Sequence, residues 1–65
     1  MHNATRLITP REKEVLHLLA KGMTYSKMAL QLDVTTETVK KHLKNIYQKL
    51  KVRNKIEALR KVKLL

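Results

Sequence analysis

Three lysines, Lys40, Lys41 and Lys44, recur at helical spacing in the second half of the chain, with Gln48 one turn further on. Lysines three and four positions apart share one helix surface, where their like charges repel and mildly destabilise an isolated helix. Guanine acceptors and phosphate oxygens would relieve this repulsion. A solvated helix face is the plainer interpretation, so the elements around the lysines must decide between the two. The apolar residues expected on the opposite, inward face are Val39, Leu43, Ile46 and Leu50.

The element that must position these lysines is a helix expected over residues 36–50. Thr35 suits its N-cap, and Glu37 in its first turn is favourable against the helix dipole. A shorter helix is expected over residues 25–32, and Asp33-Val34-Thr35 separates the two. Asp33 tolerates the left-handed backbone that such a break requires. Two helices joined by a three-residue break, the second capped and longer, predict a helix-turn-helix.

Two further helices complete the expected fold. A helix over residues 10–21 starts with a capping box of Thr9 and Glu12, and Gly22 is a natural stop. A last helix over residues 54–63 starts with a second capping box of Asn54 and Glu57. Ile56, Leu59 and Val62 are expected to face inward from this last helix.

Because β-type alternation is absent, the sequence predicts an all-α, four-helix domain over residues 9–65. Residues 1–8 lack periodicity and are interpreted as a flexible arm or the remnant of a linker.

The net charge of the chain is +10, and it is concentrated in the second half. Residues 40–65 contain ten Lys and Arg against Glu57 alone, a field that attracts polyanions. With no cysteine and three dispersed histidines, neither a metal site nor a cofactor is expected. There is no apolar run long enough for a membrane span and no signal peptide, so we expect a soluble, cytoplasmic protein.

Many positions, in order and without gaps, resemble one known family. The sequence is similar to the LuxR-type (GerE- or NarL-like) helix-turn-helix DNA-binding domains of bacterial transcription regulators. The resemblance covers residues from Leu7 to about Leu59. The residues that carry it are Leu7-Ile8-Thr9-Pro10-Arg11-Glu12-Lys13-Glu14-Val15-Leu16, Ala20-Lys21-Gly22, Met28-Ala29 with Leu32, Thr38-Val39-Lys40 with His42, Asn45-Ile46, Lys49-Leu50, and Val52-Arg53-Asn54-Lys55 with Glu57-Ala58.

This resemblance implies a domain that docks its third helix in the major groove of double-stranded DNA to regulate transcription. Matched by position, the family's base contacts fall on Lys40, Lys41 and Lys44, and Asn45 could reach a base edge or a phosphate. His42 matches the family's histidine and is interpreted as a packing residue. Phosphate contacts are expected from Thr36 and Thr38 at the start of the third helix and from Thr24, Tyr25, Ser26 and Lys27 at the start of the second.

The family also implies dimerisation through the fourth helix. Flanking Arg60, Lys61 and Lys63 should keep such a dimer weak until DNA relieves their repulsion. RNA polymerase is a further candidate partner. The apolar surface expected to mediate dimerisation consists of Val52, Ala58, Val62 and Leu65.

Four positions depart from the family pattern. Ser26-Lys27 replaces the usual Lys-Glu pair of the second helix and can add a phosphate contact instead. Lys51 stands where glycine is frequent, so it must take a costly positive φ or the helix must end differently. Lys55 replaces a common arginine and lacks the guanidinium fork.

The sequence disfavours other functions than DNA binding. An enzyme is disfavoured because Glu12 and Glu14 are explained by their place in a helix's first turn and no serine has a plausible base partner. A membrane-active peptide is disfavoured by the capped, turn-separated helices and the lack of Trp and Phe. RNA binding usually exploits aromatic residues that are scarce here. A protein-interaction module on the same scaffold should have a mixed or apolar outer third helix, whereas this one is rich in lysine.

The sequence leaves open the target DNA, activation or repression, and any sensory signal. It is compatible with a domain of a longer regulator or with a minimal, free-standing one.

Overall fold

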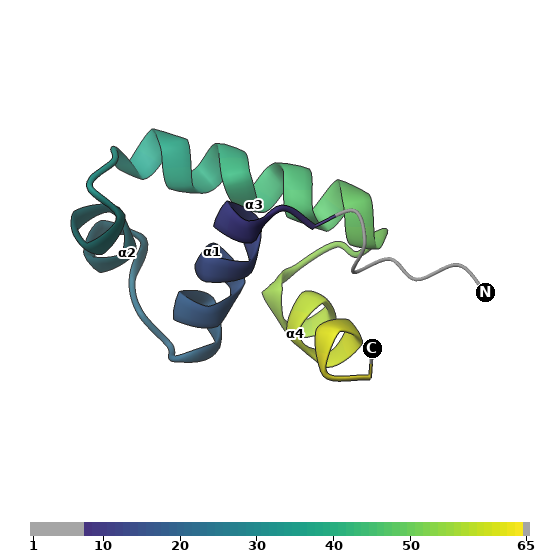
Figure 1. The fold of residues 1–65 in the computed structure, drawn as a ribbon. Coiled ribbons are helices and arrows are strands. Elements are labelled where there is room, and N and C mark those ends of the chain that lie inside the picture. Colours follow the sequence, from purple (N-terminus) through teal and green to yellow (C-terminus); the bar gives the residue numbers. More distant parts are fainter. Residues whose placement is uncertain (1–7, 65) are drawn as a thin grey trace.

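The computed structural model describes residues 8–64, with Leu64 described by its backbone alone, and contains four α-helices in this range (Figure 1). Between residues 8 and 64 there is no β-strand. The predicted all-α, four-helix fold is therefore confirmed, and every predicted helix boundary lies within one residue of the observed one. The helices are α1 (Pro10–Ala20), α2 (Tyr25–Leu32), α3 (Thr36–Leu50) and α4 (Lys55–Leu64).

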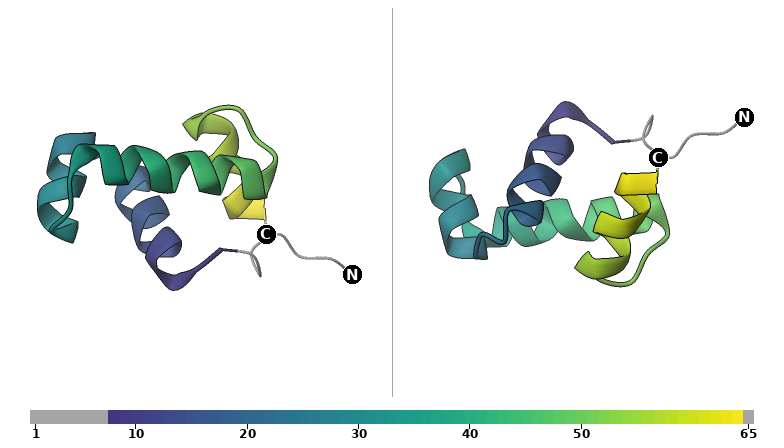
Figure 2. Two further views of the ribbon diagram at one scale, coloured as in Figure 1. Left: turned by 90° about the horizontal axis from the view of Figure 1, so that it is seen from above. Right: turned by 90° about the horizontal axis from the view of Figure 1, so that it is seen from below.

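The longest helix, α3, crosses the whole domain (Figure 1). Helix α2 lies near its N-terminal end, α4 lies near its C-terminal end, and α1 packs beneath its middle. Seen from above, no other helix covers α3, whereas the view from below shows α1 and α4 in front of it (Figure 2). One side of α3 is therefore packed against the domain and the other faces solvent.

The core is entirely aliphatic and forms where the four helices meet. Val15, Met28, Val39, Ile46 and Leu50 are its largest fully buried side chains. Burying one such side chain contributes about 1.5–3 kcal/mol, which lets a chain without disulfides hold four short helices together. All four residues expected on the inward face of α3 are buried, as predicted.

Helices α1, α2 and α3 end in the same way, with one left-handed residue after the helix. Gly22 has φ 80°, and Asp33 and Lys51 both have φ 58°. The stops expected at Gly22 and Asp33 are confirmed, and Lys51 adopts the positive φ at a cost of about 1–2 kcal/mol. In each case the next residue donates its N–H back into the helix and packs its side chain against the core; these residues are Met23, Val34 and Val52.

The N-terminal caps follow the sequence prediction for α1 and differ for α4. At α1, Thr9 Oγ1 accepts from the Glu12 N–H at 3.1 Å, and Glu12 Oε1 accepts from the Thr9 N–H at 2.9 Å. At α4, Asn54 Oδ1 accepts from the Glu57 N–H, but the Glu57 carboxylate accepts from the Arg53 N–H instead of that of Asn54. The bend at residues 53–54 turns the Arg53 amide toward the first turn of α4, so the predicted capping box is wrong in its second half.

The predicted orientation of α4 is also wrong at two positions. Ala58, expected on a dimerisation surface, is completely buried, whereas Ile56, expected in the core, is 63% exposed. Residues two apart in a helix point to nearly opposite sides, so a helix that buries Ala58 must expose Ile56. The small alanine side chain lets the backbone of α4 approach the core closely. Leu59 and Val62 are half-buried against the core, as expected of inward-facing residues.

One residue of the predicted arm is described by the structure. Ile8, assigned to the arm, is buried in the core. The remainder of the predicted arm, residues 1–7, and the predicted dimerisation residue Leu65 lie outside the described residues.

Candidate nucleic-acid interface

The residues predicted to contact bases lie together on the uncovered face of α3. Lys40, Lys41, Lys44 and Asn45 are all exposed, because the helical repeat places them opposite the buried residues of the same helix. They line a shallow hollow of about 540 Å³ with two more side chains, those of Glu37 and Gln48. We call these six residues the outer face of α3.

A second hollow links this outer face to the start of α2. Tyr25, in the first turn of α2, lines a hollow of about 410 Å³ together with Lys40, Lys44 and Gln48. Burial raises the pKa of Tyr47, at the same hollow, above its ordinary value of 10.0, and the nearby Tyr25 raises it further. Tyr47 therefore carries a neutral phenol, which places no negative charge beside the lysines.

The predicted phosphate-contact residues of α2 form its exposed N-terminal end. Thr24 is the N-cap, and its Oγ1 accepts from the Lys27 N–H at 3.2 Å. Tyr25, Ser26 and Lys27 are exposed in the first turn. The unpaired N–H groups of a helix N-terminus attract anions, and Lys27 adds a positive charge there.

At the start of α3 the predicted threonines are less accessible than their neighbour. Thr36 and Thr38 are half-buried, and the hydroxyl of Thr38 lies 3.0 Å from that of Thr35. Thr35 is exposed and accepts from the Thr38 N–H as the N-cap of α3. The sequence analysis identified Thr35 only as a cap, although the position itself places a hydroxyl at the helix N-terminus.

The outer face also carries one carboxylate that the sequence analysis did not count as a site residue. Glu37 lies 3.6 Å from the ammonium nitrogen of Lys40, and the two side chains are 81% and 57% exposed. Among the described residues, neither Lys41 nor Lys44 has a carboxylate within 4.0 Å. The face is therefore strongly basic, with a single acidic position at its N-terminal end.

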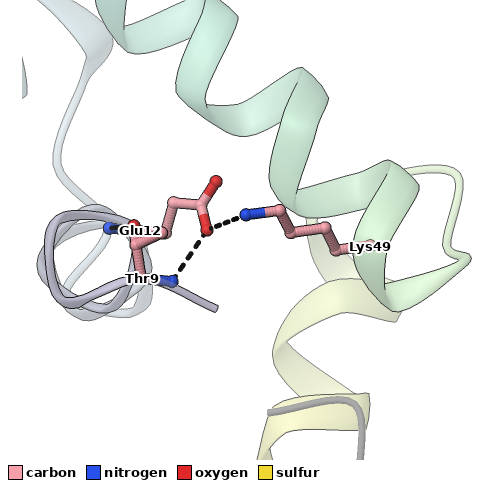
Figure 3. A network of polar contacts seen from close by, with 3 residues as sticks. All are labelled: Thr9, Glu12 and Lys49. Atoms are coloured by element: carbon pink, nitrogen blue, oxygen red, sulfur yellow. Dashed lines mark hydrogen bonds and ion pairs between the residues drawn. The ribbon is translucent and has the colours of Figure 1, made fainter. Parts of the chain in front are cut away.

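On the packed side, the fourth lysine of α3, Lys49, holds α1 in place. Lys49 Nζ donates to Glu12 Oε1 at 2.7 Å, the same oxygen that accepts from the Thr9 N–H (Figure 3). Burial alone would raise the pKa of Glu12, but hydrogen bonds from Lys49 and Thr9 and the positive charge of Lys49 hold it below 4.5. Sequence reasoning missed this ion pair because its partners are 37 residues apart.

Other kinds of site were sought over the same part of the chain. Residues 8–64 bring together no three His, Asp, Glu or Cys side chains that could hold a metal ion. None of the helices in this range is long and apolar enough to cross a bilayer. His42 is half-buried on α3, in keeping with the packing role expected for it.

Residues 6–62 match the sequence profile of the family described as bacterial regulatory proteins, luxR family. The chain belongs to the LuxR family. Because the match covers almost all of the domain, the helix-turn-helix of this LuxR-type domain is the family's DNA-binding unit, in a family of transcription regulators that are not enzymes.

Individual relatives place the LuxR-type domain within longer proteins. It is 41% identical over 51 residues to the nitrate/nitrite response regulator protein NarL of Escherichia coli, covering 78% of this chain and 24% of NarL. It is 46% identical over 54 residues to the transcriptional activator protein YukR of Yersinia ruckeri, covering 83% of this chain and 24% of YukR. The HTH-type transcriptional regulator MalT of Vibrio campbellii is 42% identical over 55 residues, 85% of this chain and 6% of MalT. The chain thus spans a quarter or less of each of these relatives.

Proposed function

We propose that this LuxR-type domain binds specific sequences in double-stranded DNA with α3 in the major groove, and thereby regulates transcription. Lys40, Lys41, Lys44 and Asn45 contact base edges in this proposal. Lysine donates to the O6 and N7 acceptors of guanine, and an asparagine amide pairs with adenine. Phosphates are bound by Thr36 and Thr38 of α3, with Thr35 added, and by Thr24, Tyr25, Ser26 and Lys27 of α2.

The observation that carries the proposal is the contrast between the two sides of α3. One side is buried in the core, and the other presents three exposed lysines with no helix packed over them (Figure 2). A major groove about 12 Å wide admits a helix whose outer side is free in this way. The start of α2 lies beside the same face through Tyr25, so it can contact the flanking backbone while α3 contacts the bases.

The experiment that tests this proposal is selection of bound sites from random duplexes at a stated salt concentration. We expect one enriched sequence. Its affinity should fall with salt at a log–log slope near −0.9 for each neutralised phosphate. Equal affinity for unrelated polyanions, or a slope near zero, would contradict recognition in the groove.

We further propose that two copies occupy paired half-sites through α4. Ile56 is exposed, and Leu59 and Val62, three and six residues on, continue a slanted apolar stripe. Leu59 and Val62 also line a hollow of about 580 Å³ between α1 and α4, which a second copy could cover. Val52 is half-buried and remains a candidate, although it lines the hollow beside Tyr25, whereas Ala58 does not contribute because it is buried.

The proposed dimer should be weak in the free protein because its apolar stripe is flanked by basic residues. Lys13 and Lys63 lie at the rim of the α1–α4 hollow, so two copies repel each other until DNA phosphates neutralise them. Ile56→Asp should abolish cooperative binding to two half-sites about one helical turn apart and leave single-half-site affinity unchanged. Ile56 is the cleaner position for this test, because a charge at Val62 would also disturb packing against the core. Independent filling of the two half-sites by the unaltered protein would contradict the dimer.

The same proposal extends to the cellular location of the domain and to its partners. A bacterial regulator that binds chromosomal DNA acts in the cytoplasm, and contact with RNA polymerase would follow from its binding near a promoter. The matched segment makes up 24% of both NarL and YukR, and we propose that sensing of a signal is carried out outside such a DNA-binding domain.

A further inference from the structure

We propose that Glu37 and Lys40 act together to recognise one G·C base pair, with Lys40 on the guanine and Glu37 on the cytosine. This inference rests on the proposed binding of α3 in the major groove and adds Glu37 as a residue that determines specificity. The observation behind it is that the one carboxylate on α3 lines the same hollow as the proposed base-contact residues.

The chemistry of the pair matches the edge of a G·C base pair. In the major groove guanine presents the acceptors O6 and N7, and cytosine presents the N4 amino group as a donor. O6 and N4 are partners in base pairing and therefore lie roughly 3 Å apart. The Lys40 ammonium and the Glu37 carboxylate are 3.6 Å apart, which offers a donor and an acceptor at a similar separation. An A·T pair also has one donor and two acceptors, but its donor, adenine N6, lies between the acceptors N7 and O4. Only a G·C pair places its two acceptors next to each other, so that one ammonium can contact both while the carboxylate accepts from the neighbouring amino group.

The free protein holds this pair loosely enough for it to change partners. Both side chains are more than half exposed, and such surface ion pairs contribute little to stability. Turning the ammonium and the carboxylate toward a base pair therefore costs little. A carboxylate at this place also repels phosphates, so it weakens binding to unrelated DNA.

Helix α1 offers a matched control for the charge of Glu37. Glu14 forms an ion pair with Arg11 at 3.7 Å, also with a spacing of three residues, and both side chains are exposed. Neither residue lines the hollow on the outer face of α3. Glu37→Ala and Glu14→Ala change the net charge of the protein equally, but only the first removes a group from the proposed interface.

The experiment is selection of duplexes from a random library by the unaltered protein and by both variants at one salt concentration. We expect the unaltered protein and Glu14→Ala to prefer a G·C pair at one position by about 5- to 150-fold, the range of one good base contact. Glu37→Ala should have a smaller preference at that position, because only the Lys40 contact to guanine remains. It should retain the rest of the selected sequence and bind unrelated duplexes at least as well as Glu14→Ala does.

A modified base then tests the contact directly. Methylation of cytosine N4 at that position keeps base pairing but replaces the hydrogen that faces the major groove. This change should weaken binding by the unaltered protein and have no effect on Glu37→Ala. Identical selected sequences for all three proteins, or equal sensitivity to the methyl group, would overturn the inference and leave the proposed function standing. Failure of the unaltered protein to select any sequence would overturn both.

Discussion

Two lysines of helix α3 form ion pairs with glutamates, and the surroundings of the two pairs differ. Lys49 meets Glu12 at 2.7 Å on the packed side, where the carboxylate is only 5% exposed. Lys40 lies 3.6 Å from Glu37 on the outer face, where water surrounds both groups. The same two residue types thus tie α1 to α3 on one side and remain available to a ligand on the other. Burial, and not residue type, separates a structural pair from a binding pair.

The largest expected effect comes from breaking the inner pair. Lys49→Met keeps an unbranched side chain only one atom shorter but leaves the buried Glu12 carboxylate without its charged donor. The free energy of unfolding should fall by about 2–3 kcal/mol, less than for a fully buried pair because Lys49 is 33% exposed. Urea denaturation measures this change. The matched variant Lys40→Met, on the outer face, should change stability by less than about 1 kcal/mol; equal losses in the two variants would remove the distinction between the pairs.

Substituting a lysine of the outer face should change the affinity for DNA and not the stability of the fold. Lys44→Ala should cost about 1–3 kcal/mol on the preferred site and relax selectivity at one base position. Lys27→Ala should weaken binding to all sequences alike, since it is proposed to bind phosphate. The affinities of Lys44→Ala and Lys27→Ala for a library of sites that differ by single bases would distinguish the two kinds of contact. If the two variants show the same profile, the division into base and phosphate contacts is wrong.

The end of α3 allows a test that affects neither pair. Lys51 has φ 58°, as Asp33 does after α2, while Gly22 holds the equivalent place after α1. Lys51→Gly should stabilise the domain by about 1 kcal/mol, because glycine adopts a positive φ without steric cost. Thermal unfolding measures this gain, and Gly22→Ala should lose stability by a similar mechanism. A loss of stability in Lys51→Gly would mean that the lysine side chain makes a compensating contact.

The smallest effect is expected from titrating the inner pair. The pKa of Glu12 is lower in the folded protein than its ordinary value of 4.5. Its contribution to stability is therefore complete above pH 4.5 and is lost as the pH falls through the folded pKa. The loss should be smaller than that of Lys49→Met, because a protonated carboxyl can still accept from the Thr9 N–H. Unfolding curves from pH 6 to pH 3 should show this decline in the unaltered protein and a shallower one in Glu12→Gln.

Local signals were enough to predict the helices and the exposed lysines of the outer face. A helix start depends on a cap such as Thr9, Thr24 or Thr35, and a helix end depends on a residue that tolerates a positive φ. Both are properties of a few neighbouring residues. The same holds for the lysines of α3, since a helix that buries Val39 and Leu43 must expose Lys40, Lys41 and Lys44.

The orientation of α4 and the burial of Ile8 depended on how the helices pack. The rotation of α4 was mispredicted because both Ile56 and Ala58 are apolar, and only the close approach of α4 to the core selects the smaller side chain for burial. Ile8 is buried in the core although it lies outside any helix, so no helical pattern could predict its burial.

The amino-acid sequence by itself determined four capped helices, their order and a basic face on the third, because each of these follows from neighbours along the chain. Tertiary structure alone decided the surroundings of each lysine–glutamate pair. Glu12 reached Lys49 across 37 residues because α1 packs beneath α3. The pair of Lys40 and Glu37 is exposed because no helix packs over the outer face (Figure 2). Both outcomes depend on the burial of aliphatic side chains, which sets the helices in place and thereby assigns each charge its surroundings.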